Sequence, residues 1–293
     1  MNAKNIPIFE LENVNYAYLN KFPALRDINL SINRGEQIVF LGSNGSGKST
    51  LLKILNGLYF PSSGKIRAFG QPLTEEIMDG AGGEFTKYFR EKVGFVFQDS
   101  DVQLFSPIVW DEIAFGPLQL DLPIDEVERR VMDVIEMLGI ENLKDRAPYT
   151  LSGGEKKKVA IASVLSLNPD VLLLDEPTNG LDPRTQRWLV ELMQELRNAG
   201  KTIITATHDL SIVEEIADRV IVLSEDHRIA ADDTPDAILS NIDLLLSVNL
   251  IHEHTHKHYG IIHKHLHAHS ADHEHKHAKI KKVIIGTKDK FEV

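Results

Sequence analysis

A glycine-rich segment at residues 42–50 constrains the fold of this chain more than any other feature. It reads Gly-Ser-Asn-Gly-Ser-Gly-Lys-Ser-Thr, follows an apolar run at 38–41 and precedes a helix-like run at 51–55. The spacing matches G-x-x-x-x-G-K-[ST], which binds phosphate when it lies between a strand and a helix. Glycines let the backbone wrap closely, so that N–H groups at the start of a helix can face an anion. The segment therefore predicts an α/β fold with a phosphate site.

Two side chains at the end of this segment carry the chemistry that the motif implies. Lys48 supplies a positive charge for the β- and γ-phosphates of a nucleotide, and Ser49 supplies a hydroxyl ligand for Mg²⁺. A flexible glycine turn is the alternative, but the flanking runs disfavour it. The predicted nucleotide-binding residues here are Gly42, Ser43, Asn44, Gly45, Ser46, Gly47, Lys48, Ser49 and Thr50.

The composition of the 293 residues is that of a globular protein with an unusual end. A formal net charge of −11 argues against a general nucleic-acid binder, and the absence of cysteine fits a reducing cytosol. No apolar stretch approaches the about 20 residues that span a bilayer, and the first residues do not resemble a signal peptide. From residue 251 onward, eight Lys against five Asp or Glu give +3, and eleven of the thirteen histidines lie there. We therefore expect one domain at 1–245 and a second at 246–293.

Polar side chains follow three further apolar runs that we expect to be strands. They are Gln98, the pair Asp175 and Glu176, and His208. Folds of the α/β class place their chemistry at the carboxyl ends of parallel strands. Asp175 suits Mg²⁺, directly or through water, and Glu176 suits activation of a water molecule. A lone histidine is usually structural, but His208 shares this position at a strand end.

A second candidate anion site lies at residues 151–155, Leu-Ser-Gly-Gly-Glu, at the start of a predicted helix. Ser152, Gly153 and Gly154 could present their backbone N–H groups to an anion. The alternative is an ordinary helix start, in which Ser152 caps the helix and Glu155 closes a capping box. The residues of this segment alone leave both interpretations open.

Tyr18 lies between two runs of alternating polar and apolar residues, upstream of the glycine-rich segment. Its ring could stack on a nucleotide base or could be a half-buried residue of a sheet, and both interpretations stay open. We expect the first run, residues 8–16, to be an edge strand. A proline-punctuated region predicts a helical subdomain at about 104–165, inserted into the α/β core, with its clearest helix at 125–138.

Together these segments resemble the nucleotide-binding subunit of an ATP-binding cassette (ABC) transporter, over about residues 8–240. The resemblance implies ATP with Mg²⁺ as the bound nucleotide, and Ser49, Gln98 and Asp175 as the residues around the metal. It also implies catalytic roles for Lys48, Gln98, Glu176 and His208. In the terms of that family, the nucleotide-binding segments correspond to an adenine-stacking aromatic (Tyr18), Walker A (42–50) and the signature (151–155). The segments at strand ends correspond to the Q-loop (Gln98), Walker B (ending at Asp175), the catalytic glutamate (Glu176) and the switch histidine (His208). Residues 181–182 correspond to the D-loop. Glu155 departs from the usual glutamine of the signature.

The fold implied by this resemblance is a P-loop ATPase with a mostly parallel core sheet, an antiparallel β subdomain and an inserted helical subdomain. The resemblance further implies that two such subunits face head to tail. Each ATP would then lie between the Walker A segment of one subunit and the signature of the other, with Ser152, Gly153, Gly154 and Glu155 contributed in trans. A homodimer is the default expectation.

A narrower resemblance at residues 98–120 is to the energy-coupling-factor importers, which take up cobalt, nickel and vitamins. The stretch contains Gln-Leu-Phe at 103–105 and Asp-Glu-Ile-Ala-Phe-Gly-Pro at 111–117. In that group it forms a groove for a membrane subunit, so the implied partners are a transmembrane coupling subunit and a substrate-binding membrane subunit at the cytoplasmic face of the membrane. The alternative is that Phe105, Trp110 and Phe115 are core residues of the helical subdomain.

The end of the chain is a histidine-rich tail with three clusters. The histidines are His252, His254, His256, His258, His263, His265, His267, His269, His273, His275 and His277. Their spacing brings imidazoles together in either an extended or a helical segment, and imidazole suits Ni²⁺, Co²⁺, Zn²⁺ and Cu²⁺. A solvated low-complexity linker and a purification tag are the alternatives. We expect a polar, mobile tail, with a possible strand at 280–285.

The sequence thus predicts the ATPase of an energy-coupling-factor importer, for nickel or cobalt in preference to a vitamin. A soluble ABC ATPase of DNA repair or translation is less favoured, because the chain has one phosphate loop, no long heptad stretch and an acidic body. A metal-storage protein with an ATPase attached is the remaining alternative.

Overall fold

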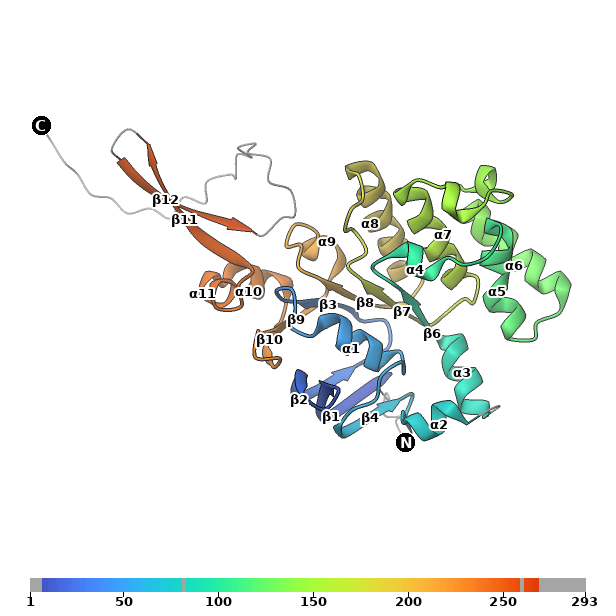
Figure 1. Ribbon diagram of the computed structural model, residues 1–293, viewed down its shortest axis with the longest axis horizontal. Helices are drawn as coiled ribbons and strands as arrows, with labels where there is room; N and C mark the ends of the chain where they lie inside the picture. The colour runs from blue at the N-terminus through green and yellow to red at the C-terminus, as the bar shows by residue number, and fades with distance from the viewer. Residues whose placement is uncertain (1–6, 81–82, 259–260, 269–293) are drawn as a thin grey trace, which may run out of the picture.

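The computed structural model describes residues 7–80, 83–258 and 261–268, with only the backbone for 253–258 and 261–268. Its described part contains a six-stranded sheet, a four-stranded sheet, a group of helices and a two-stranded hairpin (Figure 1). None of the helices within these residues is both long enough and apolar enough to cross a membrane.

The six-stranded sheet is mostly parallel and forms the centre of the molecule. Its strand order is β10-β9-β3-β8-β7-β6, and only the β10–β9 pair is antiparallel. The strands are β3 (Gln37–Leu41), β6 (Val93–Val96), β7 (Val171–Asp175), β8 (Thr202–Thr207), β9 (Arg219–Leu223) and β10 (Ile229–Asp233). Every residue of β3, β6, β7 and β8 is buried, because helices or a second sheet cover both faces, as is usual for parallel strands.

Alternate residues of the central strands feed two separate hydrophobic cores. On β3, Val39 and Leu41 pack with the helical region, whereas Ile38 and Phe40 pack with α1 (Lys48–Leu55) and the four-stranded sheet. Strand side chains alternate between faces, so one short apolar run can contribute to both cores. The rigid support of β3 on both faces fixes the position from which the glycine-rich segment starts.

The four-stranded sheet is antiparallel, in the order β2-β1-β4-β5. Its strands are β1 (Phe9–Tyr18), β2 (Phe22–Ile32), β4 (Ser63–Ala68) and β5 (Gln71–Pro72). The expectation of an edge strand at 8–16 is wrong, because β1 pairs on both sides: Leu11 lies opposite Leu30 on β2 and opposite Ile66 on β4. The partly polar alternation of β1 reflects one exposed face, and this pattern does not distinguish an inner strand from an edge.

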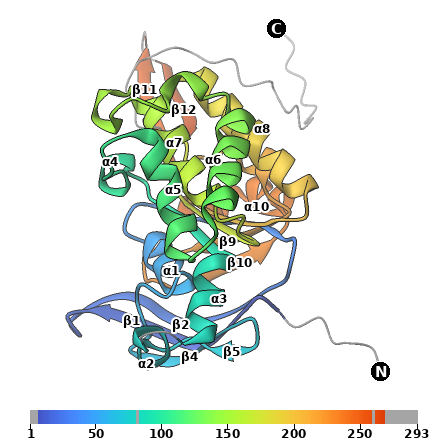
Figure 2. The ribbon, with the colours of Figure 1, turned by 90° about the vertical axis from the view of Figure 1, so that its right-hand side faces the viewer.

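The helical region stands at the end of the molecule opposite the antiparallel sheet (Figure 2). Its helices are α4 (Ser100–Gln103), α5 (Val109–Gln119), α6 (Ile124–Leu138) and α7 (Gly153–Leu165), with 3₁₀ turns η1 (Glu141–Leu143) and η2 (Pro148–Thr150). The apolar face predicted for 125–138 is confirmed, because its five aliphatic residues are all buried on α6. Gly139 ends α6 in the left-handed conformation (φ 62°). The other helices are α2 (Glu75–Asp79), α3 (Glu84–Lys92), α8 (Pro183–Asn198), α9 (Val213–Ile216), α10 (Pro235–Ser240) and α11 (Ile242–Ser247).

The first part of the histidine-rich tail forms an antiparallel hairpin of β11 (Ile251–His258) and β12 (Ile261–Ala268). The hairpin projects from the body of the protein beside α10 and α11 (Figure 1). The extended conformation is one of the two that the histidine spacing allows, and the mobility expected from the polar composition stays a prediction. The third histidine cluster, His269 and the possible strand at 280–285 lie outside the described residues.

The close approach of β6 to α7 yields a prediction about stability. A Cβ atom on Gly94 would lie 2.3 Å from Cγ1 of Val164 and 3.2 Å from Cγ of Pro169. Gly94→Ala should therefore lower the free energy of unfolding by about 1–3 kcal/mol through overpacking. Urea unfolding measures this loss, and adding Val164→Ala should recover part of it. Gly83→Ala is the matched control, because its Cβ atom would have an ordinary contact of 3.7 Å with Thr86.

Candidate active site

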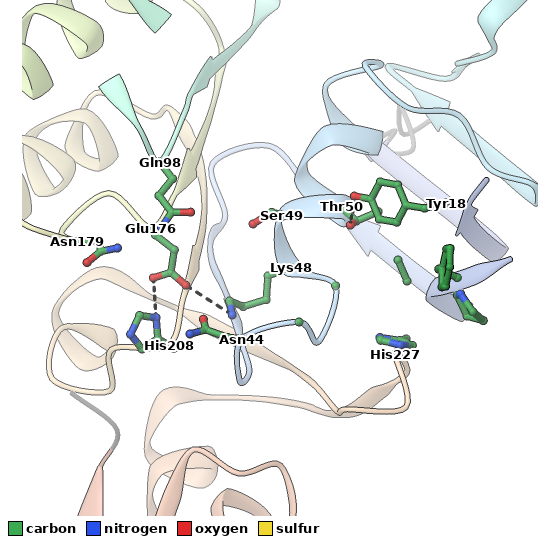
Figure 3. A pocket seen from close by; sticks show the side chains of 15 residues that line it. Tyr18, Asn44, Lys48, Ser49, Thr50, Gln98, Glu176, Asn179, His208 and His227 are labelled. Carbon is green, nitrogen blue, oxygen red and sulfur yellow. Dashed lines mark hydrogen bonds and ion pairs between the residues drawn. The ribbon is translucent and has the colours of Figure 1, made fainter. Parts of the chain in front are cut away.

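Four neighbouring strands end at one edge of the core sheet, and each one is followed by a functional candidate. The strands β3, β8, β7 and β6 are adjacent and parallel, so their carboxyl ends meet. The glycine-rich segment follows β3, His208 follows β8, and Gln98 follows β6. Asp175 ends β7 and Glu176 comes next. Figure 3 shows Lys48, Gln98, Glu176 and His208 converging on one cavity. The parallel topology therefore brings together residues that lie up to 160 positions apart (208 − 48 = 160).

The backbone of the glycine-rich segment needs glycine at specific positions. Gly47 has φ 110°, and a Cβ atom there would lie 2.3 Å from the carbonyl oxygen of Ala24. A Cβ atom on Gly42 would lie 2.6 Å from the carbonyl oxygen of Leu223. Gly47 also begins α1 without a side-chain cap, so the first N–H groups of this helix have no side-chain acceptor. A helix start of this kind is suited to bind an anion.

Lys48 places a buried positive charge over this segment. Its Nζ atom donates hydrogen bonds to the carbonyl oxygens of Gly42 (2.7 Å) and Ser43 (3.1 Å), and it lies 3.5 Å from Oε1 of Glu176. Burial lowers the pKa of Lys48, and the charge of Glu176 opposes this shift. The ammonium group is thus held by two carbonyl oxygens and by a buried ion pair with Glu176, and charge-assisted bonds to an incoming phosphate would add to these partners.

Asp175 and Ser49 form the oxygen-rich part of the site. The hydroxyl of Ser49 donates a 2.8 Å hydrogen bond to Oδ1 of Asp175, which joins the start of α1 to the end of β7. Burial raises the pKa of Asp175, and the neighbouring Glu176 adds to this increase, whereas the bond from Ser49 opposes it. A buried carboxylate with one hydroxyl donor is incompletely compensated. Oxygen ligands of this kind suit Mg²⁺.

Glu176 is held by a strained backbone and by several polar partners. Its φ angle is 41°, which is uncommon for any residue with a side chain. Oε2 accepts a hydrogen bond from Oγ1 of Thr207 (3.2 Å) and lies 3.0 Å from Nδ1 of His208. Strained conformations of this type persist where the surrounding structure imposes them, often at functional sites. The carboxylate thereby points into the cavity between Lys48 and His208 (Figure 3).

The cavity has a volume of about 500 Å³, which is sufficient for a nucleotide. Tyr18 lines it, with its hydroxyl 2.8 Å from Oγ1 of Thr50 and its ring in edge contact with Tyr16 and Tyr59. Tyr18 thus belongs both to β1 and to the cavity wall, and its stacking on a nucleotide base stays a prediction. The lining residues are Tyr18, Phe22, Pro23, Ala24, Asn44, Gly45, Gly47, Lys48, Ser49, Thr50, Gln98, Glu176, Asn179, His208 and His227.

Sequence reasoning missed His227 and Asn179 among the lining residues. His227 has φ 68°, and its Nδ1 atom lies 3.4 Å from the carbonyl oxygen of Ser46. It lies in the turn between β9 and β10, and β9 is the other neighbour of β3 in the sheet. The rule that located His208, a polar residue directly after a parallel strand, does not locate His227, because β9 ends at Leu223 and Ser224 comes next. Strand β10 was not predicted from the sequence, so the turn between β9 and β10 that contains His227 was not recognised.

The structure does not bring the segment 151–155 into the cavity of its own chain. Ser152 and Glu155 form the capping box that was one of the two alternatives: the backbone N–H and the hydroxyl of Ser152 each donate to Oε2 of Glu155 at 2.8 Å. Ser152 and Gly153 are exposed, and no atom lies within 4 Å of a Cβ atom built on Gly153. The segment thus starts α7 with open space in front of it.

Lys157, which sequence reasoning also missed, connects the loop of Gln98 to α7. Its buried ammonium group donates to the carbonyl oxygens of Phe97 (3.1 Å) and Gln98 (2.9 Å), and burial lowers its pKa. Gln103 reinforces this connection by accepting from the N–H of Phe97 and donating to the carbonyl oxygen of Ala160. The loop that carries Gln98 is therefore bonded directly to the helix that carries the segment 151–155.

The residues present fit ATP with Mg²⁺. The described residues offer no hydrogen-bond partner to the buried hydroxyl oxygens of Ser43 and Ser46, so polar groups at the glycine-rich segment remain for a ligand. The close-packed glycines, the uncapped start of α1 and the positive charge of Lys48 are all suited to a triphosphate. Ser49, Asp175 and Gln98 would hold the metal ion.

Comparison with known proteins identifies the family. The sequence model described as "ABC transporter" matches residues 25–179, which is more than half of the chain. This chain belongs to the ABC transporter ATPases. The expected resemblance and the expected fold are thereby confirmed. Members of this family couple ATP hydrolysis to transport, so the chain is an ATPase.

Named relatives of this ABC ATPase include nickel-import and energy-coupling-factor transporter ATP-binding proteins. The chain is 47% identical over 248 residues to the "Nickel import ATP-binding protein NikO" of Rhodobacter capsulatus, covering 84% of this chain and 96% of the relative. It is 43% identical over 243 residues to the "Energy-coupling factor transporter ATP-binding protein EcfA" of Methanothermobacter thermautotrophicus, covering 83% and 76%. Among solved structures, cbiO1 of Clostridium perfringens, part of the ABC transporter complex cbiONQ, matches with a TM-score of 0.70 and 41% identity, covering 83% and 95%.

The burial of Asp175 in the ABC ATPase predicts a pH-dependent gain of stability in one variant. Asp175→Asn keeps an oxygen acceptor for Ser49 but removes the buried charge. Because the pKa of Asp175 is raised in the folded state, ionisation of Asp175 lowers the stability of the nucleotide-free protein as the pH rises above the unfolded-state pKa, and the loss is complete above the folded-state pKa. The variant should therefore unfold at higher urea concentration than the wild type at neutral pH.

The difference in stability between Asp175→Asn and the wild type should shrink as the pH falls toward the ordinary aspartate pKa of about 3.9. At that pH the wild-type carboxyl group becomes neutral too. Denaturant unfolding at several pH values, without nucleotide, measures this difference. Asp121→Asn is the control, since Asp121 is an exposed residue paired with Lys87 and should give no comparable gain. An Asp175→Asn protein less stable than the wild type at neutral pH would contradict the assigned role of burial.

Proposed function

We propose that this chain is the ATP-hydrolysing subunit of an energy-coupling-factor importer that transports nickel or cobalt ions. The observation that carries the proposal is the convergence of Lys48, Gln98, Glu176 and His208 on one cavity beside the glycine-rich segment. A phosphate site, a metal-ligating carboxylate and a candidate base thus share one sheet edge. The relatives named for nickel import and for energy-coupling-factor transport support the transport role.

In the proposed mechanism, the chain uses its own charges to bind and orient. ATP would supply the electrophilic γ-phosphorus and the leaving group ADP, and Mg²⁺ would neutralise charge on the phosphate oxygens. The backbone N–H groups at the start of α1 and Lys48 bind the phosphate oxygens, and Ser49, Asp175 and Gln98 hold the metal. Glu176 orients the attacking water and accepts its proton, and His208 holds Glu176 and the γ-phosphate in position. Tyr18 stacks on the adenine.

Ser152 and Gly153, the exposed residues of the segment 151–155, support a dimeric site. The cavity of one chain includes none of these residues, and the open space in front of Gly153 leaves room for a second molecule. In the proposed head-to-tail homodimer, Ser152, Gly153, Gly154 and Glu155 of one copy complete the phosphate site of the other. ATP would thereby hold two copies together until hydrolysis releases them.

An aromatic surface next to the loop of Gln98 supports docking to a membrane subunit. The exposed fractions of Phe105 and Phe115 are 65% and 43%, and their rings are in edge contact with centroids 4.9 Å apart. Val102 is also exposed, whereas Trp110 is partly buried against the hydrophobic core. The surface and core interpretations of these residues therefore apply to different members. We propose that Val102, Phe105 and Phe115 contact a transmembrane coupling subunit, with a substrate-binding membrane subunit in the same complex.

The role of Glu176 as the base predicts separation of ATP binding from ATP turnover. Glu176→Gln keeps the shape of the side chain but removes the proton acceptor. It should lower the hydrolysis rate by about 10²- to 10⁴-fold while ATP still binds and promotes dimerisation. Phosphate release and analytical ultracentrifugation with ATP measure the two properties. Glu191→Gln is the control, since Glu191 is an exposed residue of α8 paired with Arg187. Hydrolysis by Glu176→Gln near the wild-type rate would refute the assignment.

The identity of the transported ion is tested by uptake. Cells that contain this chain together with its membrane partners should accumulate radiolabelled Ni²⁺ or Co²⁺, and cells with the Glu176→Gln chain should not.

Capture of the chain from solubilised membranes should recover a polytopic partner. Uptake of a vitamin instead would support the alternative importer class. Purification without any membrane partner would support the soluble ATPase or the metal-storage alternative.

We further propose that the histidine-rich tail binds Ni²⁺ or Co²⁺ at the cytoplasmic face of the membrane, as a buffer or sensor for the importer. The support is chemical, because imidazole is a preferred ligand of these ions. Affinity alone does not select between them, since sites of this type rank Ni²⁺ above Co²⁺ and Cu²⁺ above both.

A further inference from the structure

The register of the hairpin β11–β12 pairs histidine with histidine at three successive positions. His252 lies opposite His267, His254 opposite His265, and His256 opposite His263. We call these three pairs the His ladder. The positions between them pair residues of other types: Glu253 with Leu266, Thr255 with Lys264 and Lys257 with Ile262.

This register gathers the six histidines on one face of the hairpin. Successive residues of a strand point to opposite faces, so positions two apart share a face on each strand. A slip of the register by one residue would place every histidine of β11 opposite a residue of another type. The observed pairing is thus the arrangement that brings imidazole-bearing positions of both strands together. It also resolves the two conformations that the spacing allowed, in favour of the extended one.

The base of the hairpin is fixed to the ATPase body. Leu250 and Ile251 are buried in the same hydrophobic core as Leu245 and Val248 of the preceding segment. The ladder therefore starts one residue after a core position, and it is held at a defined place on the protein. Among the residues whose side chains are described, no group of three or more His, Cys, Asp or Glu could hold a metal ion. Within the described chain, the ladder is thus the outstanding concentration of potential transition-metal ligands.

We propose that the His ladder is a transition-metal site formed by the paired histidine positions of the two strands. Directly opposite positions of an antiparallel pair have Cβ atoms about 4.5–5.5 Å apart, so that one ion can bridge them. Neutral imidazole favours Ni²⁺, Co²⁺, Zn²⁺ and Cu²⁺ over Mg²⁺ and Ca²⁺. A bridging ion also links the strands and stabilises the hairpin, because metal binding and folding are coupled. The proposal rests on the metal-binding role proposed for the tail and assigns that role to defined cross-strand pairs.

The test exchanges neighbouring residues within each strand of the full-length protein. The β11 exchange combines His252→Glu, Glu253→His, His254→Thr, Thr255→His, His256→Lys and Lys257→His, which moves three histidines to the other face. The β12 exchange combines Ile262→His, His263→Ile, Lys264→His, His265→Lys, Leu266→His and His267→Leu. Applying both exchanges restores three histidine pairs, now on the opposite face. All variants keep the composition, the net charge and the other histidines of the wild type.

Isothermal titration with Ni²⁺, without nucleotide, is the readout. Either exchange alone should weaken the tightest Ni²⁺ binding by roughly 100-fold, because the second strand no longer supplies ligands to the same ion at high effective concentration. The combined exchange should return the affinity to within a few-fold of the wild type. ATP hydrolysis should be unchanged in all four proteins, which verifies that the body is folded.

Two results would overturn the proposal. Wild-type affinity after a single exchange would mean that the histidines bind independently of strand pairing. An affinity of the combined variant as low as that of the single exchanges would mean that something other than pairing is lost. Neither result depends on transport, so a failed uptake experiment would leave the ladder intact, and a failed titration would leave the proposed importer intact.

Discussion

The parallel pairing of β3, β8, β7 and β6 is the constraint on which the site depends. Leu41 lies beside Thr207, and Asp175 lies beside Ala206, so the strands end at the same level of the sheet. Antiparallel pairing of any one of them would send its polar terminus to the far edge. This arrangement buries charged groups away from water. Burial lowers the pKa of Lys48 and raises the pKa of Asp175, so that it favours the neutral form of each side chain. The nucleotide-free site is therefore poised to be stabilised by a ligand that carries compensating charge.

Much of the site was predictable because its signals are local. The glycine-rich segment, the polar residues after apolar runs and the apolar face of α6 each follow from short-range patterns. Lys48, Gln98, Glu176 and His208 line one cavity, and α6 buries its apolar face. What the sequence did not reveal depends on contacts between distant segments. The inner position of β1 requires knowledge of both partners, and the role of Lys157 appears only when the carbonyls of Phe97 and Gln98 face α7. The hairpin illustrates the same limit, because repeated histidines fit more than one conformation until a register is defined.

The segment 151–155 shows how one motif satisfies two physical demands. The capping box of Ser152 and Glu155 stabilises the start of α7 within the chain, whereas Gly153 contributes no packing to its own chain. Ser152 and Glu155 thus stabilise the helix start, and Gly153 provides an exposed backbone. The helix start remains well formed while one side of it stays accessible, which is what a surface shared between two molecules requires.

The bond network around Lys157 has a mechanical consequence. Lys157 and Gln103 connect the Gln98 loop, which serves the nucleotide cavity of its own chain, to α7, which begins with the segment 151–155. If two chains pair head to tail, α7 of each chain serves the cavity of the other. A displacement of Gln98 in one cavity would then be transmitted through α7 to the segment 151–155, which would lie at the second cavity. The two cavities would then be connected through α7 of each chain.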